Sequence, residues 1–315
     1  MRVLIVTNLT PDAAAPQRGR WVIDQVEAIR AHGVDVEMFG FPVGRGEYLP
    51  ALRRLRRLLR GEQFDLVHAH YGLAGWCARL AGARPLIVTF HGTDVRHRVV
   101  GPMSRRLARS VDLCAAASRA LFASEAARPG LPRPPGRTAV LPCGADLRRF
   151  RPMPRTEVRR ELGLDPQGRY LLFPANPSRP EKRHDLAVRL ADLSGAELLT
   201  GGAIDPDRMP LWINSANAVL LTSDHEGFGL VVPESLACEV PVLSTPVGIA
   251  PHALASVPGC LVAPFDEEAW LAVLRPHLEA DDSRVAGARQ AGGFCAERMA
   301  ERVLVAYRAL LAGNR

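Results

Sequence analysis

Short apolar runs alternate with amphipathic segments along the whole chain, and this alternation restricts the fold more than any other feature. In the first half, strands are predicted at 3–8, 34–39, 65–70, 86–90, 113–117 and 138–141. Helices are predicted between them at 20–31, 52–60, 72–80, 104–110 and 118–126. Strands that alternate with helices form a parallel sheet covered on both faces, and such sheets bind ligands at the carboxyl ends of their strands.

The alternation stops at a stretch rich in proline, residues 142–155, and then begins again. The second half has predicted strands at 170–175, 197–199, 218–222, 242–244 and 260–262, and predicted helices at 182–193, 208–214, 233–239, 267–279 and 296–311. We therefore predict two Rossmann-like α/β domains, 1–150 and 151–295, with a ligand in the cleft between them. The last segment, 296–315, is a helix that is a candidate to cross back to the first domain.

Composition agrees with a globular chain, because 47% of the 315 residues are hydrophobic and 23% are charged. No apolar run approaches the roughly 18–20 residues that cross a bilayer. The start, Met1–Thr7, resembles a buried strand and lacks the features of a signal peptide, so a cytoplasmic protein is expected. The six cysteines form no C-x-x-C pair, so neither a zinc site nor a disulfide framework is indicated.

The formal net charge of +7 favours anionic partners, namely nucleotides, phospholipid surfaces or nucleic acid. No nucleic-acid motif accompanies it, so nucleic acid is not predicted as a partner. The segment Leu52–Arg60 is a basic amphipathic helix with two interpretations. It contacts an anionic membrane, at the inner face, or it packs by its leucines with the arginines in water. The oligomeric state is not indicated.

Lys182 is the single lysine among 40 basic residues. Arginine serves everywhere else, so this position is a candidate for a site that needs a compact ammonium rather than a planar guanidinium. It stands where a predicted helix begins after a strand and a turn, and a helix N-terminus favours an anion.

The segment 225–237, HEGFGLVVPESLA, follows a predicted strand and leads into a predicted helix near Pro233. Its glycines allow backbone N–H groups to approach a ligand closely. Glu226 in the loop and Glu234 in the first helical turn are carboxylates that can accept hydrogen bonds from hydroxyl groups. Taken alone, Glu226 is explained as loop surface and Glu234 as a favourable charge near a helix start, so the functional interpretation depends on the whole segment.

This segment, with the following C-E-V-P-V-L-S-T, resembles the signature of glycosyltransferase family 4, whose members have the GT-B fold and transfer sugars with retention of configuration. The resemblance extends over nearly the whole chain, through D-L-V-H-A-H at 65–70, T-F-H-G-T-D at 89–94, L-P-C-G-A-D at 141–146 and R-P-E-K at 179–182. It implies a nucleoside diphosphate sugar and a hydroxyl acceptor (a glycan, lipid or small molecule) as substrates, with no metal and no separate cofactor.

The resemblance also implies roles for individual residues. Lys182 would neutralise the donor diphosphate together with Arg179 or Arg183, while Glu226 would contact the transferred sugar and Glu234 the ribose. The backbone of the loop would line the sugar and phosphate pocket, with the residues Gly227, Phe228, Gly229 and Leu230. In the first domain, His91 would touch the donor sugar and Gly19 would let the backbone approach the phosphate.

Three departures from the family pattern lead to further expectations. In the segment R-P-E-K at 179–182, which resembles the basic turn of the family, the arginine lies three residues before Lys182. The family's usual pair of adjacent glycines is replaced here by V-G-I-A-P at 247–251, which contains a single glycine. The segment between Leu199 and Ala218 is short, which predicts a reduced second sheet. Asp205-Pro206-Asp207 is the sole D-x-D match and is interpreted as a turn and helix start.

Other interpretations remain open. His68 and His70 point the same way on a strand, which could indicate metal ligation, although packed or strand-end histidines are the expected reading. A catalytically inactive GT-B module that binds a nucleotide sugar, and a GT-B nucleotide-sugar epimerase, are the alternatives to a transferase. The chain has no G-x-G-x-x-G, which counts against a dinucleotide oxidoreductase.

Overall fold

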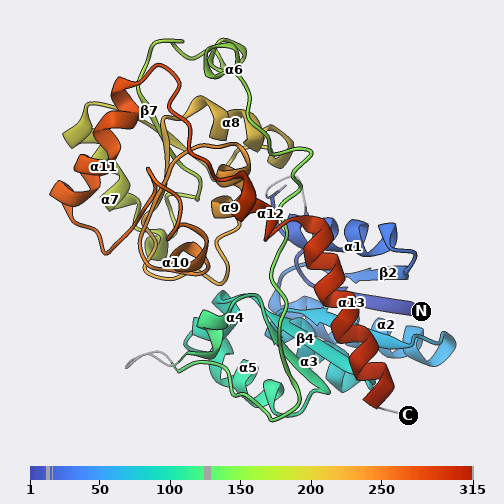
Figure 1. Cartoon of the computed structure of the whole chain (residues 1–315). Coiled ribbons are helices and arrows are strands. Elements are labelled where there is room, and N and C mark those ends of the chain that lie inside the picture. The colour runs from blue at the N-terminus through green and yellow to red at the C-terminus, as the bar shows by residue number, and fades with distance from the viewer. Residues whose placement is uncertain (12–14, 16, 124–128, 314–315) are drawn as a thin grey trace. The chain divides into compact units, whose positions relative to one another are not determined.

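The computed structural model describes residues 1–11, 15, 17–123 and 129–313, which form two compact units. The first unit comprises Met1–Gly144 with Ala296–Arg315, and the second comprises Ala145–Cys295. Each unit has its own parallel sheet (Figure 1) and its own buried hydrophobic core. The predicted fold class, two parallel-sheet α/β halves, is therefore confirmed.

The first unit is built on a six-stranded parallel sheet of order β2-β1-β3-β4-β5-β6. β1 lies between β2 and β3, with Ile5 opposite Met38 on one side and His68 on the other. β4 is buried along its whole length, which explains its continuous apolar sequence. The strands are β1 (Arg2–Thr7), β2 (Asp35–Gly40), β3 (Leu66–His70), β4 (Leu86–Phe90), β5 (Leu113–Ala116) and β6 (Thr138–Val140).

The C-terminal helix α13 packs on the core of the first unit beside α1 (Figure 1). Met299, Val303 and Tyr307 are spaced by four residues, so they share one helix face, and all three are buried. The helices of this unit are α1 (Arg20–Ala31), α2 (Tyr48–Gly61), α3 (Gly72–Ala81), α4 (Thr93–Arg96), α5 (Val100–Ala108) and α13 (Ala296–Gly313), with short 3₁₀ helices η1 (Arg45–Glu47) and η2 (Arg119–Phe122).

The second unit has a five-stranded parallel sheet of order β11-β10-β9-β7-β8, one strand fewer than the first. β7 and β9 are neighbours, with Leu171 opposite Ala218, so their carboxyl ends meet at one edge of the sheet. The strands are β7 (Tyr170–Phe173), β8 (Glu197–Thr200), β9 (Ala218–Leu221), β10 (Val242–Ser244) and β11 (Leu261–Val262).

The core of the second unit is centred on Trp270, which is fully buried and donates its indole N–H to the Pro264 carbonyl over 3.1 Å. The helices of this unit are α6 (Arg155–Leu162), α7 (His184–Ser194), α8 (Met209–Ser215), α9 (Val231–Ala237), α10 (Ala250–Ala253), α11 (Glu267–Glu279) and α12 (Ala288–Gly292), with 3₁₀ helices η3 (Pro180–Lys182) and η4 (Pro206–Arg208).

Some predicted helices were wrong in extent or position. The helix predicted at 118–126 is only the 3₁₀ turn η2 in its described part, and residues 124–128 lie outside the described residues. α5 runs from Val100 to Ala108 rather than over 104–110. α9 begins at Val231, two residues before Pro233, because a proline in the first turn removes no helical hydrogen bond. Within the described residues, no helix is long and apolar enough to cross a membrane.

Candidate functional site

The turn after β7 carries Arg179, Lys182 and Arg183 and is called the basic turn here. Hydrogen bonds from residues that directly follow β9 hold it in place. Within the turn, the Lys182 amide donates to the Arg179 carbonyl over 3.0 Å, and Arg183 adopts a left-handed conformation at the start of α7. The Thr222 hydroxyl lies 2.9 Å from the carbonyl oxygens of both Lys182 and Arg183. The amide of Asp224 donates to the Glu181 carbonyl over 2.9 Å. The turn is therefore fixed to the carboxyl end of β9, where parallel sheets bind ligands.

Lys182 and Glu226 meet at this edge of the sheet. Lys182 Nζ lies 2.5 Å from Glu226 Oε1, and the two side chains are only 12% and 11% exposed. The Ser223 hydroxyl donates to the same carboxylate oxygen over 2.8 Å. The structure thus brings together two of the predicted site residues, which are 44 positions apart in sequence. Such a charge-assisted contact is among the stronger hydrogen bonds of a protein.

The two arginines that flank Lys182 are also paired with acids. Arg179 Nη2 lies 2.6 Å from Glu181 Oε1, and Arg183 contacts both Asp185 and Asp224. Arg179 is half-exposed and Arg183 about a third exposed, so both guanidinium groups are accessible to a ligand. The structure places both arginines on the turn and does not favour one of them for a diphosphate.

The glycine loop before α9 packs through a contact that the sequence patterns did not predict. Phe228 is buried, and its carbonyl accepts the Ile249 amide over 2.9 Å. Gly248 has φ +56°, and a Cβ added there would lie 2.2 Å from the Phe228 carbonyl oxygen. Only glycine therefore fits at 248. Gly248 stands where the family pattern has paired glycines, and this was the feature of the sequence from which the close contact could have been predicted.

The other predicted residues of this loop are distributed along it. Gly227 and Gly229 are partly buried, and Gly229 has φ +89°, a backbone conformation that favours glycine. Leu230 immediately precedes α9, and Glu234 lies in the first turn of that helix. Next to Glu234, the Ser235 hydroxyl is buried and has no hydrogen-bond partner in the described part of the chain.

In the first unit, Gly19 immediately precedes α1 with φ +68°. A Cβ at this position would lie 1.8 Å from the Leu9 carbonyl oxygen. The loop after β1 therefore approaches the start of α1 so closely that only glycine is accommodated. Gly19 is required for this packing whatever else it contacts.

His91 follows β4 and lies at the end of a row of histidines. Its Nε2 is 3.0 Å from His70 Nδ1, and the ring of His70 stacks on that of His68 with centroids 4.4 Å apart. His68 is in turn 2.7 Å from the hydroxyl of Tyr307 on α13 and 2.7 Å from that of Thr89. The histidine pair of β3 therefore bonds to side chains and to His91, as packed strand-end histidines do.

Burial keeps these histidines neutral. It lowers the pKa of His68 and of His91 to about 3, and it lowers the pKa of His70 well below its usual value.

Asp94 lies beside these histidines, and burial raises the pKa of its carboxyl group to about 6. Its carboxylate accepts hydrogen bonds from the backbone N–H groups of His91, Gly72 and Gly92. These three bonds fix the turn that carries His91, a role that the sequence analysis did not assign to Asp94.

Asp205 and Asp207 form a turn, as predicted. An Asp205 carboxylate oxygen accepts the Asp207 amide over 2.9 Å at the start of η4, and Asp207 pairs with Arg149 at 3.1 Å. Over residues 1–11, 15, 17–123 and 129–313, no three His, Cys, Asp or Glu side chains are grouped as a metal site.

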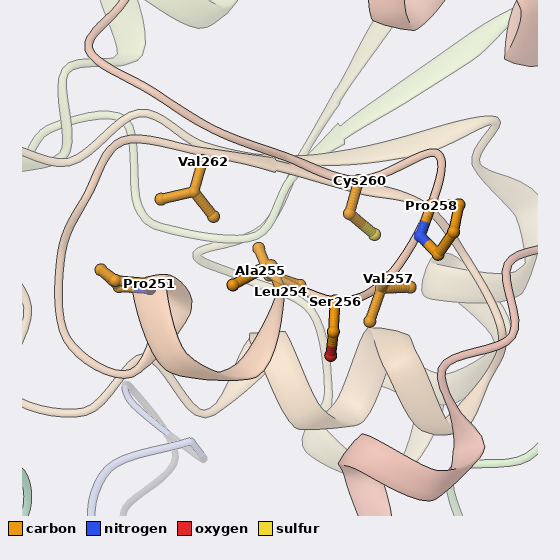
Figure 2. Close-up of a pocket in the computed structure, with 8 residues that line it drawn as sticks. All are labelled: Pro251, Leu254, Ala255, Ser256, Val257, Pro258, Cys260 and Val262. Carbon is orange, nitrogen blue, oxygen red and sulfur yellow. The ribbon is translucent and has the colours of Figure 1, made fainter.

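A cavity of about 630 Å³ in the second unit is lined by other residues (Figure 2). It is formed mainly by the end of α10 and the segment that leads to β11, with the lining residues Pro251, Leu254, Ala255, Ser256, Val257, Pro258, Cys260 and Val262. None of these eight lining residues carries a charge. It therefore offers no group that would neutralise a diphosphate, and Lys182 with Glu226 remains the candidate site.

Comparison with known proteins gives matches over both units. Two family models match, Glycosyltransferase Family 4 over residues 1–149 and Glycosyl transferases group 1 over residues 169–279. D-inositol 3-phosphate glycosyltransferase of Segniliparus rotundus is 30% identical over 302 residues, covering 79% of this chain and 67% of that protein. The protein of the same name from Actinosynnema mirum is 29% identical over 310 residues, covering 78% and 72%.

Solved structures share the fold at lower identity. Sucrose-phosphate synthase from Thermosynechococcus elongatus matches with a TM-score of 0.73 and 19% identity over 99% of both chains. Anabaena HepE in complex with UDP and glucose matches with a TM-score of 0.68 and 17% identity, over 98% of this chain and 100% of that one. At these identities the likeness shows a common architecture.

Proposed function

Because the chain belongs to glycosyltransferase family 4 and is a glycosyltransferase with the GT-B fold, we propose that it transfers a sugar from a nucleoside diphosphate sugar to a hydroxyl acceptor with retention of configuration. The observation that carries this proposal is the Lys182–Glu226 pair at the carboxyl edge of the second sheet. It combines a cation suited to phosphate with a carboxylate suited to sugar hydroxyls. The complex of HepE with UDP and glucose supports the choice of donor class.

Lys182 neutralises the diphosphate in this proposal, together with Arg179 or Arg183. Glu226 accepts hydrogen bonds from the transferred sugar and Glu234 from the ribose. The backbone of 227–230 lines the pocket. In the first unit, His91 contacts the donor sugar and Gly19 the phosphate. These roles follow from the resemblance and from the chemistry of each group.

The transfer step breaks the bond between the sugar C1 and the diphosphate oxygen, which keeps the electron pair. The acceptor oxygen forms the new bond to C1 on the same face, and its proton passes to the leaving phosphate. Charge that develops on the phosphate is stabilised by Lys182 in a site shielded from water, which is usually a large catalytic term. Cationic side chains supply this neutralisation, so the proposed reaction needs no metal ion.

The acceptor is proposed from two observations. The curated relatives are named for D-inositol 3-phosphate, which makes a phosphorylated polyol the first acceptor to test. Helix α2 turns Arg53, Arg54 and Arg57 outward while Ala51 and Leu55 pack beneath it. An exposed basic face of this kind supports contact with an anionic membrane, where a lipid acceptor would reside.

The proposed function is tested by incubating the protein with UDP, GDP, ADP and dTDP sugars and inositol phosphate, with and without a chelator. We expect one nucleotide to be released in step with product formation, with the anomeric configuration retained by NMR and no effect of the chelator. Inversion of configuration would contradict the retaining mechanism.

Two alternatives give different outcomes in the same assay. Tight donor binding without turnover for any donor and acceptor would indicate an inactive GT-B module. Formation of an epimeric donor in the absence of acceptor would indicate an epimerase. Release of nucleotide together with a glycosylated acceptor excludes both as the principal activity.

A further inference from the structure

Four ring side chains of the first unit form one continuous row: Tyr307, His68, His70 and His91. The Tyr307 hydroxyl bonds to His68, His68 stacks on His70, and His70 Nδ1 lies 3.0 Å from His91 Nε2. The row begins on α13 and ends at the turn after β4. The position of His91 is therefore set by groups from three elements of the same unit.

His68 and His70 differ in how their nitrogens are used. His68 bonds through both, because its Nε2 also lies 2.7 Å from the Thr89 hydroxyl. His70 bonds through Nδ1 alone. Its Nε2 is buried and has no hydrogen-bond partner in the part of the chain that the structure describes, and the residue is 0% exposed. Because this nitrogen has no partner, it determines which ring nitrogen of His70, and in turn of His91, carries the proton.

The His70–His91 contact contains a single proton. Both rings are neutral because burial holds the pKa of each far below neutral pH. The neighbouring acid, Asp94, directs its carboxylate to backbone N–H groups rather than to either ring. A neutral imidazole has one N–H and one lone pair, so either His70 Nδ1 donates to His91 Nε2 or the reverse holds.

The two arrangements leave different atoms unsatisfied. If His91 donated, the only proton of His70 would be on Nε2, as a buried N–H with no acceptor. If His70 donates, Nε2 has only an unused lone pair, and His91 carries its proton on Nδ1. Buried N–H groups without an acceptor are rarer in proteins than under-satisfied acceptors, so the second arrangement is favoured.

We propose that His70 is a positioning residue, which donates from Nδ1 to His91 Nε2 and so holds His91 as the neutral tautomer protonated on Nδ1. The His91 ring is partly exposed, and its Nδ1 makes no hydrogen bond within the described residues. Tyr71 and Trp21 flank the ring with centroids 5.3 and 5.8 Å away, which limits its rotation.

His91 therefore offers an N–H donor to an oxygen of its ligand and has no lone pair there to act as a base. This consequence rests on the proposed function, which assigns His91 to the donor sugar. A sugar hydroxyl or ring oxygen is the class of acceptor that an N–H donor selects. The tautomer itself is a property of the free protein and is independent of the substrate.

The tautomer is measured by long-range ¹H–¹⁵N NMR of the histidine rings in the ligand-free protein. We expect His91 to show a protonated Nδ1 and an unprotonated Nε2. His70→Phe keeps a stacked ring and removes the donor, so the protonated Nδ1 signal should be lost or mixed. His70→Asn can present an amide N–H near the position of Nδ1 and should restore it.

A wild-type His91 protonated on Nε2, or an unchanged His91 spectrum in His70→Phe, would overturn the proposal. Tyr307→Phe is the matched control, because it alters the opposite end of the same row, where Tyr307 contacts His68 rather than His91. It should lower Tm and leave the His91 tautomer unchanged. If His70→Phe does not fold, the wild-type and His70→Asn spectra still decide.

Activity provides a second and separable readout. His70→Phe should lower kcat/KM about tenfold, the size expected for one lost hydrogen bond, and His70→Asn should recover most of it. If His91→Ala transfers sugar at the wild-type rate while the NMR result holds, the assignment of His91 to the donor fails and the tautomer stands.

Discussion

At the scale of single residues, every cation of the basic turn already has an acidic partner. Lys182 pairs with Glu226, Arg179 with Glu181, and Arg183 with two aspartates. A diphosphate that binds Lys182 must therefore compete with the Glu226 carboxylate. In the proposed function, the released carboxylate would then be available to the hydroxyls of the donor sugar, which would link phosphate binding to sugar binding.

This competition predicts the behaviour of Glu226→Gln. The substitution removes the charge that neutralises Lys182, so UDP and inorganic pyrophosphate should bind more tightly, by roughly fivefold or about 1 kcal/mol. Transfer should slow, because the sugar loses its carboxylate contact. Calorimetric titration measures the first effect, with the exposed Glu279→Gln as the control of equal charge change. Weaker binding of both ligands to Glu226→Gln would show that the carboxylate does not compete.

At the scale of elements, the ends of β3 and β4 hold three neutral histidines, of which His68 and His70 are fully buried and His91 is partly exposed. In the unfolded chain these groups take up protons near pH 6.5. In the folded protein the pKa of His68 and of His91 is about 3, and burial holds the pKa of His70 well below its usual value. The unfolded state therefore binds more protons as the pH falls. Asp94 acts in the opposite direction between about pH 6 and pH 4, because its folded pKa is raised. Three histidines outweigh one aspartate, so acid destabilises the fold.

We expect the free energy of unfolding to fall on the order of 3 kcal/mol between about pH 7.5 and about pH 5. Urea unfolding at the two pH values measures it. His70→Phe, which removes one of the three groups while Asp94 still opposes them, should reduce the loss by more than a third, whereas replacing the exposed His32 by Gln should not. A free energy of unfolding that stays constant or rises on acidification would contradict the neutral, buried row.

The second prediction at the scale of elements is that the exposed basic face of α2 binds an anionic membrane. Arg53→Glu with Arg57→Glu should weaken binding to phosphatidylcholine vesicles that contain about one-third phosphatidylglycerol by at least about tenfold, because each basic residue near an anionic surface contributes about 1 kcal/mol. Co-sedimentation at low salt measures it. Arg106→Glu on α5 with Arg109→Glu directly after that helix is the matched control, since both arginines are exposed. Equal losses in the two double variants would mean that net charge, rather than α2, decides binding.

At the scale of the whole molecule, most strands and helices were predictable because buried parallel strands are continuous apolar runs and covering helices are amphipathic. Helix α6 was not predicted, since its buried face is Arg155 and Arg159 beside a single apolar residue, Val158. These guanidinium groups donate to the carbonyls of Ser283 and Ser215. A helix that packs by such bonds has no apolar period to detect.

The candidate site was predictable as residues but not as contacts. Lys182 and Glu226 stood out by residue type and by resemblance, whereas their direct pairing joins positions 44 residues apart. The bond between His68 and Tyr307 spans 239 residues, so no local pattern could predict the row that supports His91. Gly248 became significant only once its backbone was seen against the Phe228 carbonyl.

The measurement that tests the central claim most directly is the turnover of the identified nucleoside diphosphate sugar by Lys182→Ala. The account predicts that kcat falls by roughly a hundredfold to a thousandfold, since the variant loses a charge-assisted contact worth about 2.7–4 kcal/mol in the transition state. Arg189→Ala is the control, because Arg189 is an exposed cation on α7, the helix that follows the basic turn, and pairs with Glu267 of α11. This variant should leave kcat unchanged. Wild-type turnover by Lys182→Ala would contradict the account.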